Sequence, residues 1–342
     1  MWVKGELLDD FVAAREIARG ELDRSNQTNL FDRLDWFERV WAHCPPGKAP
    51  LIARARAENT DAWLFLARTD ETTAVSLGSW YTLAFRPVFS GESDEKVRAA
   101  QLVALARRLA TGLSTIILEP VPNSDDTANL ILSAFRRAGW IGVMNPKTGS
   151  WTADVAGKSF AEFWAERPGE VRSTRDRKLK KFDVKTKVYT GFDEAAWASY
   201  EAIYGESWKE HEGSPAFLKA MAQTEGSAGT LRLGIASFEG EAVAAQLWTV
   251  ENGRALIHKL AYREDKAELS AGTILSAALF KHAIDIDHVS IIDYGTGDDR
   301  YKQSWMNSRE QLYTLELYNP KTLAGIIGAA KSWLSTLVRR GS

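Results

Sequence analysis

Apolar and polar positions follow one another along the chain in a mixed pattern of helix-like and strand-like segments. Apolar residues that recur every three to four positions predict helices, and runs with a period of two predict strands. The first half is therefore expected to hold both kinds of element. The helices are predicted near 28–42, 93–111 and 125–138, and the strands near 50–57, 62–68, 72–78, 83–89, 114–119 and 150–155.

The second half repeats this theme. Helices are predicted near 159–166, 168–182, 194–208, 214–223, 270–286 and 298–305, and strands near 230–238, 242–251, 254–262, 288–294 and 309–318. Turns at Glu239-Gly240 and Asn252-Gly253 join the first three of these strands into hairpins. Both halves thus run strands, helix, strand, helix, strand, which predicts an internal duplication. The expected fold class is α/β (α+β), with two similar domains that each hold a mixed, mostly antiparallel sheet flanked by helices.

Composition narrows the classes of protein that this pattern allows. The chain has 342 residues, with 43 Lys and Arg against 45 Asp and Glu, so a general polycation for nucleic acid is excluded. Its one cysteine, Cys44, excludes a disulfide framework and a cysteine-rich metal site, so no metal is expected. The N-terminal residues lack the basic start and apolar run of a secretory signal, and no stretch approaches the ~20 apolar residues that span a bilayer. The expected location is cytoplasmic, with any membrane contact peripheral.

The two halves differ just before their long helix. The second half carries Leu269-Ser270-Ala271-Gly272-Thr273, small residues that let backbone N–H groups approach a ligand at the positive end of a helix. The first half carries Gly91-Glu92-Ser93-Asp94-Glu95 there, and three acids repel a pyrophosphate. An anionic cofactor is therefore predicted in the second half only. The alternative interpretation is that Ser270 simply caps the helix.

A strand end, a glycine turn and a polar helix start follow within residues 293–305. A Walker loop, a serine-hydrolase elbow and a zincin motif are all absent from the chain. With strand Arg254–Tyr262 and the loop before the long helix, the pattern Asp293-Tyr294-Gly295-x-Gly297-Asp298-x-x-Tyr301-Lys302-x-x-Trp305 resembles the CelD/BcsL-type acetyltransferases of the GNAT superfamily. These are relatives of the FemAB aminoacyltransferases, which are built from two GNAT-like domains. The resemblance covers residues 155–318 and departs at Ser270-Ala271-Gly272, where family members often have Ser-Pro-Gly.

The resemblance implies a tandem GNAT-like architecture and an acyl-CoA co-substrate. Residues 1–155 would form a degenerate GNAT-like domain, 156–319 the domain that binds acyl-CoA, and 320–342 a separate C-terminal helix. Pantetheine would lie between two splayed strands, and the pyrophosphate would lie on the loop of Leu269, Ser270, Ala271, Gly272 and Thr273. Lys259 is a further candidate for phosphate binding, with a structural ion pair as its alternative.

Four residues are candidates for the chemistry. The resemblance implies that Tyr301 protonates the leaving thiolate, although a packed aromatic side chain is the alternative. The base that deprotonates an incoming ammonium is expected to be His258 or Asp293, because histidine has a suitable pKa and a buried carboxylate can acquire one. Lys302 would bind phosphate or pair with Asp293. His211 is a candidate on the acceptor side, and a solvated helix end is its alternative.

Two basic segments bear on partners. One is the run of Arg172, Arg175, Arg177, Lys178, Lys180, Lys181, Lys185 and Lys187, which fits a CoA phosphate, an anionic acceptor, a membrane surface or simply a solvated face. The other, residues 320–342, contains no acid, and its apolar residues fall on one side of a helix. That helix is expected either to dock on the first domain or to lie on anionic lipid.

The resulting functional expectation is an acyl-CoA-dependent N-acyltransferase. Bacterial ceramide synthases are similar to members of this broad group, so a long-chain sphingoid amine is the most specific acceptor predicted, giving a ceramide-like amide. The alternatives are acetylation of a polysaccharide precursor and a non-catalytic acyl-CoA-binding protein. A transferase that uses aminoacyl-tRNA is a further alternative, which the neutral overall charge disfavours.

Overall fold

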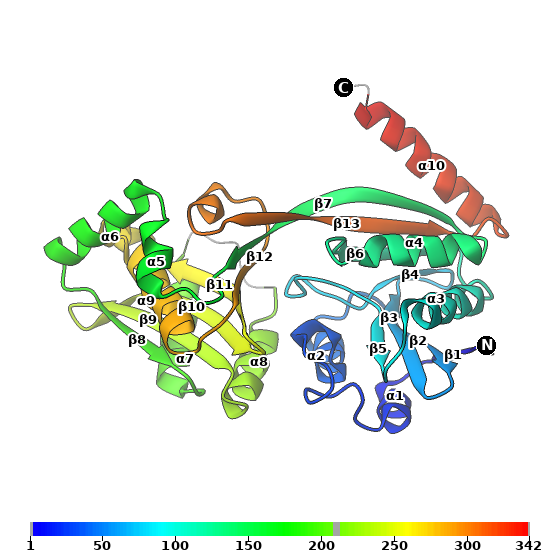
Figure 1. Ribbon diagram of the computed structural model, residues 1–342, viewed down its shortest axis with the longest axis horizontal. Helices are drawn as coiled ribbons and strands as arrows, with labels where there is room; N and C mark the ends of the chain where they lie inside the picture. Colours follow the sequence, from blue (N-terminus) through cyan, green and yellow to red (C-terminus); the bar gives the residue numbers. More distant parts are fainter. Residues whose placement is uncertain (1–2, 208–212, 341–342) are drawn as a thin grey trace. The chain divides into compact units, whose positions relative to one another are not determined.

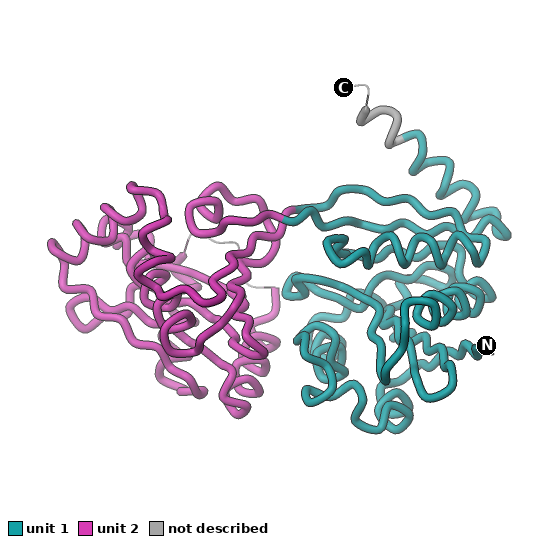
Figure 2. Tube along the Cα trace, in the orientation of Figure 1, with its two compact units in different colours: residues 1–148, 310–342 teal, residues 149–309 magenta. Residues whose placement is uncertain are grey.

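The chain forms two compact units (Figure 2). In the computed structural model, residues 3–207 and 213–340 are described, with side chains up to 334. Unit 1 consists of Met1–Thr148 together with Glu310–Ser342, and unit 2 consists of Gly149–Arg309. Unit 2 is thus inserted between two segments of unit 1. The sequence-based boundaries at 155 and 319 differ from these, because strand Ser308–Tyr318 contributes mainly to unit 1.

Unit 1 is a mixed sheet flanked by helices (Figure 1). Its strands are β1 (Lys4–Leu8), β2 (Ala49–Ala57), β3 (Thr60–Arg68), β4 (Thr73–Ser76), β5 (Val88–Ser90), β6 (Thr115–Val121), the first part of β7 (Ile141–Asp154) and most of β13 (Ser308–Tyr318). They lie in the order β1-β2-β3-β4-β6-β13-β7, and β5 pairs with β3. The neighbours β4 and β6 are parallel, whereas β1–β2, β2–β3, β3–β4 and β6–β13 are antiparallel.

The helices of unit 1 are α1 (Phe11–Ala18), η1 (Leu30–Asp32, a 3-10 turn), α2 (Leu34–His43), α3 (Glu95–Leu109), α4 (Thr127–Arg137) and α10 (Leu323–Arg340). Helices α1 to α4 each bury apolar residues, whereas the large apolar side chains of the last helix are exposed as far as residue 334. Asp94 caps α3, since its side chain accepts a hydrogen bond from the N–H of Val97 at 2.8 Å, which satisfies a backbone donor that the helix itself leaves unpaired. Phe37 of α2 stacks on Phe65 of β3 with ring centroids 4.0 Å apart.

Unit 2 is built in the same way. Its strands are β8 (Lys185–Tyr189), β9 (Leu231–Phe238), β10 (Glu241–Glu251), β11 (Arg254–Tyr262) and β12 (Ile291–Thr296), and the end of β7 pairs with β12. Its helices are α5 (Phe160–Ala165), α6 (Gly169–Lys181), α7 (Glu194–Gly205), α8 (Pro215–Ser227), α9 (Ala271–Asp285) and the 3-10 segments η2 (Glu264–Leu269) and η3 (Arg300–Ser304). The order is β8-β9-β10-β11-β12, with β11 and β12 parallel and the other pairs antiparallel.

The two units share one topology. In each, a run of four antiparallel strands, followed in unit 1 by the short β5, precedes a long helix, and the strand after the helix is parallel to the fourth strand. The helix is α3 in unit 1 and α9 in unit 2, and the returning strand is β6 or β12. The predicted fold class is confirmed, and the duplication inferred from the sequence is visible as this repeated order.

An aromatic cluster forms the centre of the core of unit 2. Phe280 of α9 lies 5.3 Å from the ring of Trp248 on β10, 5.2 Å from that of Phe163 on α5 and 4.9 Å from that of Trp305. Trp305 therefore fixes the end of η3 to the core. Burial of such large rings contributes several kcal/mol to stability.

Several elements differ from the prediction. The strand expected at 83–89 is reduced to β5, and the helix expected at 298–305 is the 3-10 segment η3. Strands β1 and β8 were not predicted; β8 reads Lys-Thr-Lys-Val-Tyr and lies at a sheet edge without a buried face. The first part of β7 was also missed, since Pro146 and two glycines interrupt its apolar pattern.

Candidate functional site

Strands β11 and β12 separate after three paired positions. Arg254 pairs with Ile291, Ala255 with Ile292 and Leu256 with Asp293, and no further pair joins them among the described residues. Strand β11 continues to Tyr262, and β12 continues to Thr296. Beyond the last pair, backbone N–H and C=O groups lack a neighbouring strand, so this opening can accept an extended ligand by hydrogen bonding.

A β-bulge in β11 lies at the mouth of this opening. Trp248 of β10 pairs with Ile257, whereas Leu247 pairs with Lys259, so His258 is the extra residue. Ile257 and Leu260 both pack against the core that contains α9. A strict alternation of side chains, with His258 and Leu260 on one face, is therefore wrong for this strand. The bulge is the physical reason, because an inserted residue reverses the facing of the positions that follow.

His258 is partly buried at the bulge. Its Nε2 atom lies 2.8 Å from the Thr249 hydroxyl of β10. Burial is the main cause that lowers the pKa of His258 to about 4, and the charge of Lys259 acts in the same direction, against the charge of Glu225. The imidazole is therefore neutral at pH 7, and its burial makes it a weaker base than a solvent-exposed histidine.

Lys259, a candidate for phosphate binding, lies toward a different element. Its side chain is buried, and its ammonium is 5.6 Å from the ring centroid of Tyr204 on α7. The loop of residues 269–273 lies at the start of a different helix, α9. The neighbouring side chain Leu260, and not Lys259, packs against the core that contains this helix. The structure thus directs Lys259 toward α7 through a cation–π contact.

The loop before α9 has an unusual backbone. Ser270 adopts a left-handed conformation, with φ 51° and ψ 36°, and its side chain makes no capping hydrogen bond. The interpretation of Ser270 as a plain helix cap therefore lacks its expected contact. A Cβ atom on Gly272 would meet the Tyr262 ring at 3.5 Å, which is ordinary van der Waals contact, so this position accepts a Cβ without a clash.

Gln246 fixes the start of α9 to the sheet, and sequence reasoning did not single it out. Its Nε2 donates to Ser276 Oγ at 2.7 Å and to the Gly272 carbonyl at 3.3 Å. Its Oε1 accepts from Trp248 Nε1 at 2.9 Å. A glutamine inside an apolar strand is the only signal the sequence offers, because the partners on α9 lie 26 and 30 positions away along the chain.

The basic helix α6 packs on α9. Lys178 donates to the carbonyl of Glu268, directly before the loop. None of the α6 side chains is fully buried. The loop before α9 therefore combines a helix N-terminus with a neighbouring cationic helix, two features that favour a phosphate.

Asp293 and Lys302 hold the glycine turn after β12. Asp293 Oδ2 pairs with Arg254 Nη1 at 3.0 Å, and its Oδ1 accepts from the N–H of Gly295 at 2.8 Å. Lys302 is buried and donates to the Thr296 carbonyl, and burial lowers its pKa. Gly297 has a φ of 108°, a backbone conformation that favours glycine at that position.

Tyr301 follows this turn and is partly exposed. Its ring lies 5.5 Å from that of Tyr294 at an angle of 74°. Burial and the charge of Asp299 raise the pKa of Tyr301, so the phenol keeps its proton at neutral pH. Tyr294, which sequence reasoning did not choose, is buried and interacts with the Ser276 hydroxyl.

Five of the sequence-predicted features thus lie on the elements that border the opening. His258 marks the bulge in β11, Asp293 ends the paired part of β12, Tyr301 and Lys302 follow its turn, and the loop 269–273 begins the helix between the two strands. His211 lies outside the described residues.

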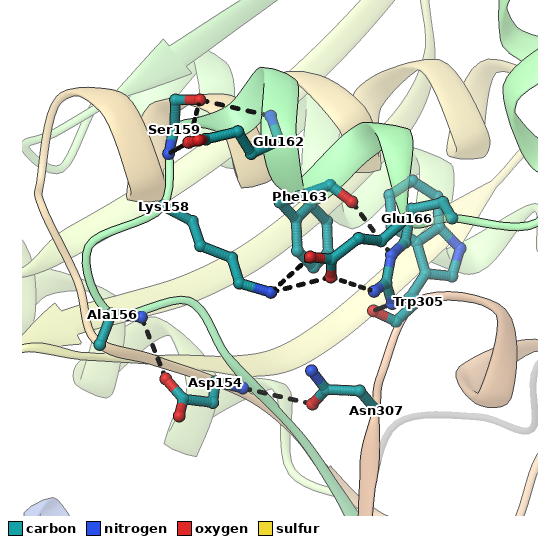
Figure 3. A network of polar contacts seen from close by, with 10 residues as sticks. Asp154, Ala156, Lys158, Ser159, Glu162, Phe163, Glu166, Trp305 and Asn307 are labelled. Atoms are coloured by element: carbon teal, nitrogen blue, oxygen red, sulfur yellow. Dashed lines mark hydrogen bonds and ion pairs between the residues drawn. The ribbon is translucent and has the colours of Figure 1, made fainter.

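A polar network lies beside η3 (Figure 3). Arg167 is buried and donates through Nη1 to the Trp305 carbonyl at 2.7 Å. Lys158 pairs with Glu166 at 2.7 Å, and Ser159 and Glu162 form a capping box at the start of α5. A cavity of about 450 Å³ beside Lys158 lies away from the opening, and Ser159 and Glu162 in its wall are hydrogen-bonded to one another.

The comparisons with known proteins agree with this fold. The structure of FemX is similar to 92% of the chain over 98% of its own length, with a TM-score of 0.62 and 12% sequence identity. A conserved protein of unknown function from Bacteroides thetaiotaomicron matches over 91% of this chain and 98% of its own, with a TM-score of 0.54 and 14% identity. L-PGS from Bacillus licheniformis matches over 79% and 85%, with a TM-score of 0.50 and 14% identity.

At these identities the similarity shows the fold alone. Residues 169–303 match the family described as an acetyltransferase (GNAT) domain. This segment lies within unit 2 and includes the opening, the loop before α9 and most of the glycine-turn motif. No curated protein matches the chain. The family match supports an N-acyltransferase enzyme of the GNAT type, which confirms the prediction at that level.

Two further observations concern the described residues alone. No helix among them is both long and apolar enough to cross a membrane. Within the same residues, no group of three or more histidine, cysteine, aspartate or glutamate side chains is placed to hold a metal ion.

Proposed function

We propose that this protein transfers an acyl group from an acyl-CoA thioester to an amine, and that the transfer takes place in the opening between β11 and β12. The observation that carries the proposal is that the strands separate beside the point where His258 forms a bulge. A bulge turns backbone groups out of the ladder, and N–H groups aimed at a thioester oxygen stabilise the charge that develops there.

The reaction follows from elementary acyl transfer. The amine nitrogen attacks the thioester carbonyl carbon, the C–S bond breaks, and the nitrogen loses a proton as the amide forms. His258, neutral at pH 7, accepts that proton, and Tyr301 donates one to the leaving thiolate. Asp293 is the alternative base, although its ion pair with Arg254 and its bond to Gly295 favour a role in holding the turn.

The loop before α9 is the proposed site for the phosphates of the acyl donor. We assign the pyrophosphate to residues 269–273, where the helix begins without a side-chain cap and Lys178 of the basic helix contacts the preceding carbonyl. Lys259 and Lys302 are better explained as packing and turn-forming residues. The resemblance to CelD/BcsL-type acetyltransferases supports CoA, rather than aminoacyl-tRNA, as the carrier.

Product analysis tests the reaction directly. Purified protein is incubated with a mixed acyl-CoA pool and a panel of amines that includes sphingoid bases, and free thiol and new amides are measured by mass spectrometry. Release of CoA together with one new amide is expected. Acyl-CoA binding without any turnover would support the non-catalytic alternative, and an acetylated sugar amine would support the polysaccharide precursor.

We further propose a lipid amine as the acceptor, with the enzyme bound peripherally to a membrane. Helix α10 turns small residues toward the rest of unit 1: a Cβ on Gly328 would lie 2.6 Å from the Tyr318 ring, and Ser332 donates to Glu316. Up to residue 334, its large apolar side chains are 45% to 75% exposed, namely Leu323, Ile326, Ile327, Trp333 and Leu334. Residues 320–342 carry four basic side chains and no acid, which suits an anionic lipid surface.

Vesicle flotation tests this surface. Full-length protein is expected to float with vesicles that contain phosphatidylglycerol at low salt and to be released at high salt. The double variant Trp333→Ser with Leu334→Ser should lose most of this binding while keeping its thermal stability. Trp80→Ser removes another exposed tryptophan of the same unit and should leave flotation unchanged. Equal flotation of all three proteins would contradict the proposal.

A further inference from the structure

Unit 1 contains a cavity that the proposed acyl transfer does not use. It has a volume of about 350 Å³ and lies between β5 and the start of α4, just past the end of β6. Gln27, Asp32, Arg86, Phe89, Arg98 and Asp125 are among the residues that line it. This volume is at the lower end of small-molecule pockets, which span roughly 300–1,000 Å³.

The carboxylate of Asp32 has a buried oxygen without a hydrogen-bond donor. Its Oδ1 atom is inaccessible to solvent and has no partner among the described residues. Burial is the main cause that raises the pKa of Asp32 to about 6; Asp125 acts in the same direction, while Arg86 and Arg33 oppose it. An unsatisfied buried carboxylate destabilises a fold, so its presence in a cavity wall points to a donor that arrives with a ligand.

The other charges of the cavity fall into one pair and one remaining cation. Arg86 Nε pairs with Asp125 Oδ2 at 3.1 Å. Arg98 donates through Nε to Ser93 Oγ at 3.2 Å, and its guanidinium lies 5.1 Å from the ring centroid of Phe89. Within the described residues Arg98 forms no ion pair. The cavity wall therefore holds one carboxylate oxygen without a hydrogen-bond donor, on Asp32, and one cation without an ion pair, Arg98.

We propose that this cavity binds a small zwitterion of the amino-acid class, with its ammonium group at Asp32 and its carboxylate at Arg98. A ligand with both charges satisfies the two groups at once, whereas a simple cation or anion leaves one of them uncompensated. The stack of Arg98 on Phe89 presents the guanidinium edge for a bidentate contact with a carboxylate. Binding here is independent of CoA and of the chemistry in unit 2.

Calorimetry on the full chain tests the proposal with defined probes. Glycine, alanine, lysine and glutamate are the zwitterions, and ethylammonium and acetate are the single-charge controls. At least one zwitterion is expected to bind in the millimolar range or tighter, and both controls at least about tenfold more weakly, as expected for loss of one charge-assisted hydrogen bond. Absence of binding by all four amino acids at about 10 mM, or equal binding of acetate, would overturn the proposal.

Variants separate a binding role from a structural one. Asp32→Asn and Arg98→Gln should each weaken binding about tenfold or more, while Asp32→Asn unfolds at a temperature no lower than the wild type, because it removes an unsatisfied buried charge. Asp9→Asn and Arg107→Gln are matched controls at exposed positions of the same unit and should bind normally. Unchanged affinity of Asp32→Asn, or a marked fall in its thermal stability, would show that the carboxylate serves the fold instead.

Discussion

The two units use the same strand order, yet the space between the fourth strand and the returning strand differs. In unit 1, Ser76 Oγ donates to the Glu119 carbonyl at 2.8 Å and accepts from the Glu119 N–H at 3.2 Å. The N–H of Phe85 donates to the Pro120 carbonyl at 2.7 Å. The end of β4 and the chain that follows it therefore satisfy backbone groups of β6. The corresponding groups that face each other beyond the last pair of β11 and β12 have no strand between them in the described parts of the chain.

The same topology can therefore leave an opening between two strands, as in unit 2, or have it filled by nearby chain, as in unit 1. A strand pair that ends early is only a potential site, because nearby chain can satisfy its exposed backbone groups. In unit 2 the connection after β11 leads at once into η2 and α9, so no described segment returns to fill the opening. We therefore expect binding of the acyl donor to depend on unit 2 alone.

The largest effect should come from the bulge. His258→Gln removes the proposed base and is expected to lower kcat by roughly 10²–10⁴, with little change in CoA affinity. Rates at saturating acyl-CoA and amine provide the measurement, and Asp293→Asn should have the smaller effect of the two. His43→Gln changes an exposed histidine of unit 1 and serves as the control. If His258→Gln keeps the wild-type kcat, another group is the base.

A second prediction contrasts two ionisable groups whose pKa values move in opposite directions. His258 has its pKa lowered from 6.5 to about 4, so the unfolded chain binds more protons in this range and stability is lost as the pH falls from 6.5 to 4. Asp32 has its pKa raised from 3.8 to about 6, so the folded chain binds more protons in this range and the penalty develops as the pH rises from 3.8 to 6.

Unfolding measured between pH 4 and pH 7 checks this contrast. Relative to wild type, His258→Gln should lose less stability on acidification, and Asp32→Asn should lose more. Each difference is expected to be on the order of 2–3 kcal/mol, since a shift of one pKa unit corresponds to about 1.4 kcal/mol. Parallel pH profiles for all three proteins would mean that neither group is as perturbed in the folded state as its surroundings indicate.

The smallest effect concerns the loop before α9. Gly272→Asp places a negative charge at the helix N-terminus and should weaken CoA binding by about 1–2 kcal/mol, which is roughly 5–30-fold. Gly272→Ala is the matched control, because the space beside Gly272 accepts a Cβ without a clash. Equal CoA affinity of the two variants, measured by calorimetry, would move the pyrophosphate away from this loop.

Much of unit 2 is predictable from the sequence because its elements are long and regular. Helix α9 and strands β9 to β11 have clear apolar patterns and glycine turns, and the motif at residues 293–305 indicates the turn after β12. The bulge at His258 is not predictable, since a single inserted residue leaves the composition of a strand unchanged. Gln246 was missed for a related reason: its role depends on Gly272 and Ser276, which only the tertiary fold brings near it.

Unit 1 was harder to predict. The segment 83–89 is predicted as a strand, but only its end forms β5, and Phe85 instead hydrogen-bonds to Pro120 of β6. Asp32 gives no signal in the sequence, where it is one acid among many and lies within the helix predicted near 28–42. Only the burial of its Oδ1 atom without a donor marks it as unusual.

The insertion of unit 2 within unit 1 has a consequence for synthesis on the ribosome. Strand β13 pairs with β6, yet the whole of Gly149–Arg309 is made between them. At about 5–20 residues per second, the edge of β6 waits roughly 10–30 s for its partner. By the end of that interval nearly all of unit 2 has been synthesised. Unit 1 still lacks β13, a central strand of its sheet. We therefore expect the inserted unit to complete its folding before the unit that contains the N-terminus.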